Sequence, residues 1–265
     1  MSIPPRDRAA DLERLQLVIQ PQPDDFTCGP TCLHAIYRYW GNEVPLPQLV
    51  DEIARTPSGG PADVFLAIDA LQRGYKATIF TYNLRIFDPT WFLTKDVDLR
   101  DRLRKQSAIK SAQRPVFGLL TEAYLRFLDL GGALRYADLS PGLLRRWLRG
   151  GVPILTGLSS TYLYRRMREY GPNDDDDDVR GEPQGHFVVL CGYRRTKRAV
   201  LVADPFLEHP NAPATHYEVG LDRVVGAILL GVLTHDANLL MIEPTDRPQR
   251  PQRPPRQPRP VPTSN

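Results

Sequence analysis

The segment QPDDFTCGPTCLHAIYRYWG, residues 22–41, decides how the first part of the fold is built. Its apolar residues recur at helical spacing, at Leu33, Ile36, Tyr37 and Trp40. Just before Cys28 come two aspartates and a threonine, which are residue types that favour helix caps and turns. The pattern therefore predicts a helix over about residues 28–40 that begins at a cysteine.

A thiol in the first turn of a helix lies at the positive end of the peptide dipoles, which stabilises its thiolate form. The residues after Cys28 suit that position: Gly29 lets other backbone approach, and Pro30 has no N–H to leave unpaired in a first turn. Gln22, six residues earlier, can offer an amide donor to a developing oxyanion beside the Cys28 N–H. The alternative is a capped core helix with a structural cysteine.

A histidine opens a second segment that carries chemistry. The run GHFVVLCGY, residues 185–193, is apolar and rich in β-branched residues, and it predicts a buried strand. Residues 199–204 predict the returning strand of a hairpin. His186 and Asp204 then lie at the same open end, where Asp204 can accept from one imidazole nitrogen while the other faces Cys28. The alternative is a structural histidine and a turn-forming Asp-Pro pair.

Several short motifs follow one another along the chain in an order that matches a known family. They are Gln22, Cys28-Gly29-Pro30, Gly41, Gly185-His186, Gly192-Tyr193 and Asp204-Pro205. In this order they resemble the papain-like cysteine peptidases of the bacteriocin-processing type, which remove double-glycine leader peptides. The resemblance covers about residues 16–82 and 141–242. It implies Cys28 as nucleophile, His186 as base, Asp204 as the group that orients the base, and Gln22 as oxyanion donor.

The chain also departs from that family. Such peptidases usually sit on an exporter that has membrane spans and an ATPase. This sequence has no apolar run near the roughly 18 residues that a span needs. It also lacks a Gly-x4-Gly-Lys phosphate loop. We therefore expect a free-standing peptidase with no membrane span.

Helices come first and antiparallel strands later in the expected order of elements, which is the α+β pattern. Helices are expected at about 28–40, 46–55, 62–73, 141–149 and 221–230, and strands at about 75–82, 152–158, 186–194, 198–204, 214–219 and 238–243. We expect an N-terminal extension over residues 1–15, a papain-like peptidase domain over 16–244 and a disordered tail over 245–265. A helical insert at about 83–140 has no counterpart in the family pattern, and is either extra scaffold or a lid over the cleft.

Composition limits the remaining possibilities. A chain of 265 residues with 42% hydrophobic content can bury one good core. The first 15 residues lack the apolar stretch of a signal peptide, and three cysteines is an odd number, so we expect a cytoplasmic protein. Cys32 and Cys191 are expected to be buried and structural. A Cys28–Cys32 disulfide and a zinc site that includes His34 are the alternatives, but no second ligand pair stands at zinc spacing, and we expect neither cofactor nor metal.

The C-terminal tail differs in composition from the rest of the chain. From Arg247 it reads RPQRPQRPPRQPRPVPTSN, with five arginines and no acid. Such a segment favours extended, polyproline-like conformations. Without it the formal net charge changes from +3 to 3 − 5 = −2. The tail is either a solvated terminus, a ligand for a proline-recognising partner or a contact for a polyanion.

Five consecutive aspartates, Asp174–Asp178, come shortly before His186. Like charges in a row repel one another and stay solvated, so a mobile loop is expected. The alternative is a neighbour of the cleft that selects substrates by charge.

These features together predict a cysteine peptidase that cleaves a peptide or isopeptide bond in a peptide or protein substrate, without a nucleic-acid partner. A transpeptidase or deamidase would use the same residues with a different acceptor. A non-catalytic domain that holds peptides in the same cleft would need no working triad. A hyper-reactive cysteine distinguishes the enzymes from the binding domain.

Overall fold

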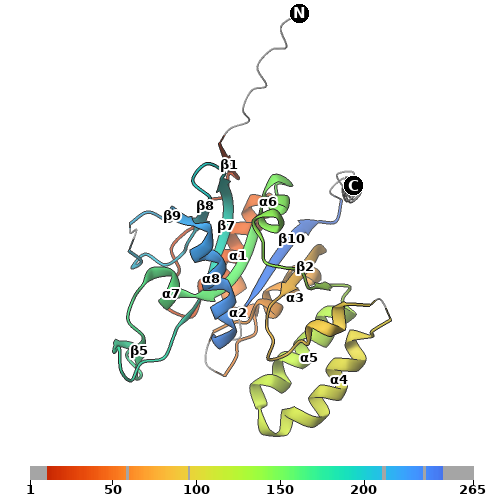
Figure 1. The fold of residues 1–265 in the computed structure, drawn as a ribbon. Coiled ribbons are helices and arrows are strands. Elements are labelled where there is room, and N and C mark those ends of the chain that lie inside the picture. The colour runs from red at the N-terminus through yellow and green to blue at the C-terminus, as the bar shows by residue number, and fades with distance from the viewer. Residues whose placement is uncertain (1–10, 58–59, 95, 211–212, 235–236, 247–265) are drawn as a thin grey trace, which may run out of the picture.

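A mostly antiparallel sheet forms the centre of the protein (Figure 1). The computed structural model describes residues 11–57, 60–94, 96–210, 213–234 and 237–246. Within them the strands of the main sheet are β1 (Leu12–Arg14), β2 (Tyr75–Thr81), β3 (Ala133–Arg135), β4 (Ile154–Ser159), β7 (Gly185–Arg194), β8 (Ala199–Ala203), β9 (His216–Gly220) and β10 (Asn238–Pro244). Their order is β3-β2-β10-β4-β7-β8-β9, with β1 beside β7, and β2 with β3 is the parallel pair.

Helices cover both faces of this sheet. They are α1 (Cys28–Tyr39), α2 (Leu46–Glu52), α3 (Asp63–Gln72), α4 (Leu99–Lys110), α5 (Pro115–Asp129), α6 (Pro141–Arg149), α7 (Ser160–Tyr164) and α8 (Leu221–Leu230), with the 3-10 turns η1 (Pro89–Phe92), η2 (Ser111–Gln113) and η3 (Gly231–Thr234). In Figure 1, α8 lies in front of the sheet and α1 behind it. The predicted α+β class, with N-terminal helices packed on a largely antiparallel sheet, is confirmed.

The alternation of side chains along β7 explains why the sheet has a core on each face. Phe187, Val189 and Cys191 pack into the core that contains α1, α3 and α5. Val188 and Leu190 pack into the other core, with α6, α7 and α8. Because successive side chains of a strand point to opposite faces, a continuous apolar run is what a strand buried on both faces requires.

Helix α1 is fixed tightly against the rest of the protein at its N-terminal end. A Cβ added to Gly29 would lie 2.6 Å from Pro61 Cγ, so only glycine allows this approach. One turn later the Cys32 thiol donates to the Phe187 carbonyl oxygen at 3.3 Å. Thr27 precedes the helix, but its hydroxyl bonds with Asp24 rather than capping a helical N–H. Packing, and not a side-chain cap, therefore sets where α1 begins.

The segment 83–140 is joined to the body through a shared core. Tyr124 and Phe127 of α5 are fully buried in the core that also contains α1 and α3. Figure 1 shows α4 and α5 on the far side of α3, away from α8. Because α3 and α5 contribute side chains to the same core, packing fixes the position of this segment relative to α3.

Three observations complete the comparison with the sequence. Residues 12–14 add strand β1 inside the segment expected to be an N-terminal extension. Two of the consecutive aspartates form β6 (Asp175–Asp176), which pairs with β5 (Glu169–Tyr170), so part of the expected mobile loop is a small hairpin. The tail from residue 247 onward and residues 1–10 lie outside the described residues.

Candidate active site

Three elements place the predicted triad at one end of the sheet. Cys28 is the first residue of α1, His186 is the second residue of β7, and Asp204 follows the last residue of β8. Cys28 and His186 are each 7% exposed and Asp204 is fully buried. The hairpin register pairs Val189 with Ala203, which brings the open ends of β7 and β8 together. Residues far apart in sequence thus meet because one helix start faces one hairpin end.

His186 lies between the other two groups. Its Nε2 is 2.8 Å from Asp204 Oδ1. The Cys28 thiol is close enough to this ring to raise the pKa of His186. Since Asp204 engages Nε2, the ring nitrogen that remains for the thiol is Nδ1. This is the arrangement in which one nitrogen exchanges a proton with a nucleophile while the other is held by an acid.

The Asp204 carboxylate receives more hydrogen bonds than the one from His186. Tyr164 and Tyr217 donate their hydroxyls to Oδ2, at 2.6 and 2.5 Å. The Phe206 backbone N–H donates to Oδ1 at 3.0 Å. The sequence did not predict the two tyrosines. Tyr217 lies opposite Val202 in the register of β8 and β9, so strand pairing could have indicated it. Tyr164 ends a short helix, and no strand register relates it to Asp204.

His186 and Asp204 stabilise each other's charged form. Burial by itself lowers the pKa of His186, but the Asp204 carboxylate and the Cys28 thiol outweigh it and raise that pKa to about 10. Burial likewise works to raise the pKa of Asp204, whereas the His186 charge and the bonds from His186, Tyr164 and Tyr217 lower it below its ordinary value. An imidazolium therefore lies against a carboxylate at neutral pH. A thiolate at Cys28 would meet this cation and the N-terminus of α1.

Gln22 lies close to the same site. Its backbone N–H donates to the Pro205 carbonyl oxygen at 2.9 Å, which ties it to the residue after Asp204. Its side-chain Nε2 donates to the Asp24 carbonyl oxygen at 2.9 Å. An amide nitrogen carries two hydrogens, so one remains for another acceptor. The sequence predicts that this amide serves an oxyanion, and the structure ties Gln22 to Asp24 and to Pro205, the residue after Asp204.

The other two cysteines lie in the core. Cys32 and Cys191 are fully buried, and all three cysteines are free thiols. Burial raises the pKa of the Cys32 thiol well above its ordinary value and that of Cys191 to about 12. Such thiols react slowly because the thiolate is the reactive form. Among the described residues, no three His, Cys, Asp or Glu side chains form a group that could hold a metal.

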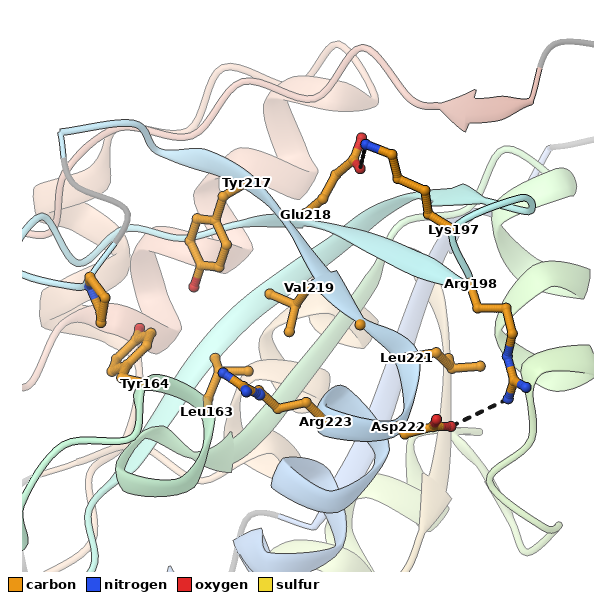
Figure 2. Close-up of a pocket in the computed structure, with 12 residues that line it drawn as sticks. Leu163, Tyr164, Lys197, Arg198, Tyr217, Glu218, Val219, Leu221, Asp222 and Arg223 are labelled. Atoms are coloured by element: carbon orange, nitrogen blue, oxygen red, sulfur yellow. Dashed lines mark hydrogen bonds and ion pairs between the residues drawn. The ribbon is translucent and has the colours of Figure 1, made fainter.

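A cavity of about 630 Å³ lies beside β9 (Figure 2). Tyr164 and Tyr217 line it at one end, and Figure 2 shows their hydroxyl oxygens directed toward each other. Val219 and Leu221 contribute apolar walls, and Arg223 extends along it. The two tyrosines that donate to the Asp204 carboxylate thus also line this cavity.

The acidic run makes its contacts with neighbouring arginines and not with the triad. Arg180 pairs with Asp177 at 2.6 Å and lies over the Tyr170 ring at 4.3 Å. Arg168 donates to the Asp178 carbonyl oxygen. The hydrogen bonds from Arg180 and Val179 lower the pKa of Asp177 to about 2. These contacts order one part of the run and offset some of its charge.

Comparison with known proteins finds similar solved structures. One is a double glycine motif protease from an AMS/PCAT transporter in complex with the leader peptide, at 13% identity, TM-score 0.41, and coverage of 88% of this chain and 94% of that chain. The peptidase domain of Streptococcus ComA, a bi-functional ABC transporter, has 12% identity, TM-score 0.38, and coverage of 85% and 97%. A protein from Bacillus anthracis described as a C39-like peptidase has 14% identity, TM-score 0.44, and coverage of 86% and 95%.

The first of these neighbours is described as a double glycine motif protease, the type of peptidase that the sequence motifs resemble. No family model matches the chain, and no curated protein matches it. Within the part of the chain that the structure describes, no helix is both long and apolar enough to span a membrane.

Proposed function

We propose that this chain is a cysteine peptidase that hydrolyses a peptide or isopeptide bond through Cys28, His186 and Asp204. The observation that carries the proposal is the position of His186, which bonds Asp204 through Nε2 and lies close enough to the Cys28 thiol for that thiol to raise its pKa. A nucleophile needs a base, and the base needs an orienting group. All three groups are buried or nearly so, where electrostatic interactions are stronger than in water.

The first half of the reaction is acylation. The Cys28 thiolate attacks the substrate carbonyl carbon, and the carbonyl oxygen becomes an oxyanion. The Cys28 N–H belongs to the first turn of α1, whose N–H groups have no partner within the helix, and Gln22 Nε2 supplies the second donor. His186 then gives its Nδ1 proton to the leaving amine as the C–N bond breaks. The product is a thioester on Cys28.

The second half releases the acyl group. His186, now neutral, takes a proton from water, and the resulting hydroxide attacks the thioester carbonyl. The carboxylic acid product leaves and the Cys28–His186 ion pair is restored. Asp204 holds the ring orientation in both halves and stabilises the imidazolium. A transpeptidase would differ at this step alone, because an amine would replace water as the acceptor.

The test uses the full chain and Cys28→Ala as the matched inactive variant. Because the motifs resemble double-glycine leader peptidases, a peptide library that includes Gly-Gly bonds is the first substrate set. Cleavage that the wild type performs and Cys28→Ala does not supports the proposal. An added amine acceptor then separates hydrolysis from transfer, since transfer yields a product extended by the amine. Failure of wild type and variant alike, together with equal alkylation rates at Cys28 in wild type and His186→Ala, contradicts an enzyme.

The proposal extends to the setting of the protein. A nucleophilic thiol works only when it is reduced, and the three free thiols suit a cytoplasmic location. The peptidase domain is proposed to span residues 16–244, with the segment 83–140 as an insert. The tail at 245–265 is proposed to act through its proline and arginine content on a proline-recognising partner. Expression in an oxidising compartment, with loss of Cys28 alkylation, tests the first of these statements.

A further inference from the structure

Four hydrogen bonds converge on the Asp204 carboxylate, the group that is proposed to orient His186. Oδ1 accepts from His186 Nε2 and from the Phe206 N–H, at 2.8 and 3.0 Å. Oδ2 accepts from the hydroxyls of both Tyr164 and Tyr217, at 2.6 and 2.5 Å. Each oxygen therefore has its own pair of partners, and the plane of the carboxylate is determined by four bonds.

The two tyrosines come from elements that cannot move independently of the sheet. Tyr217 lies in β9, paired with β8 directly before Asp204, and Tyr164 ends α7, which packs on α8. The His209 ring lies against both, with ring centres 5.9 Å from Tyr164 and 4.6 Å from Tyr217. The ring of Phe206 stacks on Tyr164 at 6.2 Å. Aromatic packing thus holds both hydroxyls where they are.

We infer that Tyr164 and Tyr217 are positioning residues, which hold the Asp204 carboxylate ionised and turned so that Oδ1 faces His186. The inference rests on the proposed function and adds the groups that set its acid–base pair. Two hydroxyl donors on Oδ2 stabilise the anion and oppose uptake of a proton there. They also prevent rotation of the carboxylate, which would exchange the oxygen that His186 contacts.

The rings of Tyr164 and Tyr217 also line a cavity, so the contribution of each hydroxyl can be tested separately from that of its ring. Both rings wall the cavity beside β9 (Figure 2), while their hydroxyls face Asp204. A change of tyrosine to phenylalanine keeps the wall and removes only the donor. Tyr193→Phe is the matched control, because Tyr193 is also buried and lies on the same strand as His186, but its ring contacts Arg145.

The first measurement is steady-state cleavage by Tyr164→Phe, Tyr217→Phe and the double variant. Each single variant should lower kcat about tenfold and leave KM within about twofold, because the lost bond orients the base and does not touch the substrate. The double variant should lower kcat about 100-fold. The acid limb of the kcat profile should move to higher pH, since Asp204 then takes up a proton more readily. Tyr193→Phe should change neither quantity.

The second measurement does not need turnover. In a Cys28→Ala background, the downfield proton resonance of His186 Nε2–H reports the bond to Asp204, and it disappears as Asp204 becomes protonated. Its midpoint should rise by about one pH unit in each tyrosine variant. That shift supports the inference even if no substrate is ever cleaved, in which case the proposed peptidase function is what fails. Unchanged kcat and an unchanged midpoint, or a lower melting temperature with an unchanged midpoint, overturn it.

Discussion

Among the described residues, Asp204 and Asp63 are two carboxyl groups with almost no exposed surface, and their surroundings differ. Asp204 is fully buried beside a cation and accepts from two tyrosines. Asp63, the first residue of α3, is 1% exposed; its Oδ1 accepts from Tyr124 at 3.3 Å, and its Oδ2 has no hydrogen-bond partner among the described residues. The pKa of Asp204 is lowered, whereas burial raises that of Asp63 to about 7.

The comparison shows that burial alone does not decide whether a carboxyl group is charged. Both groups lose water, which favours the neutral acid. At Asp204 the imidazolium and the hydroxyl donors outweigh that loss. At Asp63 the groups that work to lower the pKa, which are Asn238, the Val64 backbone and Tyr124, are neutral, and no cation is paired with it within the described residues. The first site is built to keep a charge, and the second holds a proton near neutral pH at the junction between α3 and α5.

The largest effect is expected from Asp204→Asn. It keeps the shape of the side chain but removes the charge that holds the imidazolium, so kcat should fall roughly 10³–10⁴-fold. The measurement is cleavage of the substrate found for the wild type, with folding checked by circular dichroism. Asp63→Asn is the matched control, because it makes the same chemical change at a buried site away from the triad. Equal losses in both variants would mean that the carboxylate acts through stability and not through His186.

His186→Ala should make Asp204 resemble Asp63 by leaving it without a cation. Breaking a buried pair costs about 3–5 kcal/mol of unfolding free energy at pH 7. The pKa of His186 in the folded protein is raised to about 10. Its stabilisation is therefore complete below about pH 6.5 and is lost as pH rises through about 10.

Urea unfolding at several pH values checks this expectation. The wild type should lose stability between about pH 7 and 10, and His186→Ala should not show that loss. Parallel curves for the two proteins across this range would contradict a folded-state ion pair. Cys28 alkylation at pH 6 should also be slower in His186→Ala, because a neighbouring cation favours the reactive form of a thiol.

Asp63→Asn should remove a second pH dependence of stability, which comes from a protonated carboxyl group and not from a cation. A folded pKa near 7 against about 3.8 unfolded means that the folded state binds the proton more tightly. The contribution is thus complete below about pH 4 and is lost as pH rises through 7, by up to ~4 kcal/mol. Thermal or urea unfolding at pH 5 and pH 8 measures it: the variant should gain stability relative to wild type between these values. A difference in stability between variant and wild type that is the same at pH 5 and pH 8 would show that Asp63 is ionised in the folded protein at both pH values.

The smallest effect is expected where the ion pair is exposed. Arg180 and Asp177 lie 2.6 Å apart on the acidic hairpin, and the Arg180 side chain is 65% exposed. Arg180→Gln should shift the melting temperature by less than about 2 °C, because solvent and salt screen such a pair. Calorimetry at low and high salt checks it. A large shift would show that this ion pair stabilises the protein as strongly as a buried ion pair does.

Much of the fold could be predicted because its elements carry strong local patterns. Helix α1, the strand that begins before His186 and the hairpin with β8 lie within a residue or two of their predicted bounds. The expected approach of His186 and Asp204 followed from the same pattern, because a hairpin with a short turn brings its open ends together. Strand β1 was missed, since three residues with mixed polarity carry no period.

The sequence by itself determined which residue types begin α1 and end the hairpin, and so which thiol, imidazole and carboxyl groups are available for the proposed peptidase. Local periodicity and chain reversal are enough for that, because both depend on neighbours in sequence. Only the tertiary structure decided that Tyr164 and Tyr217 converge on Asp204, and that Asp63 is buried without a cation. Those outcomes depend on strand register and on which helices share a core, and such contacts join residues that no local pattern relates.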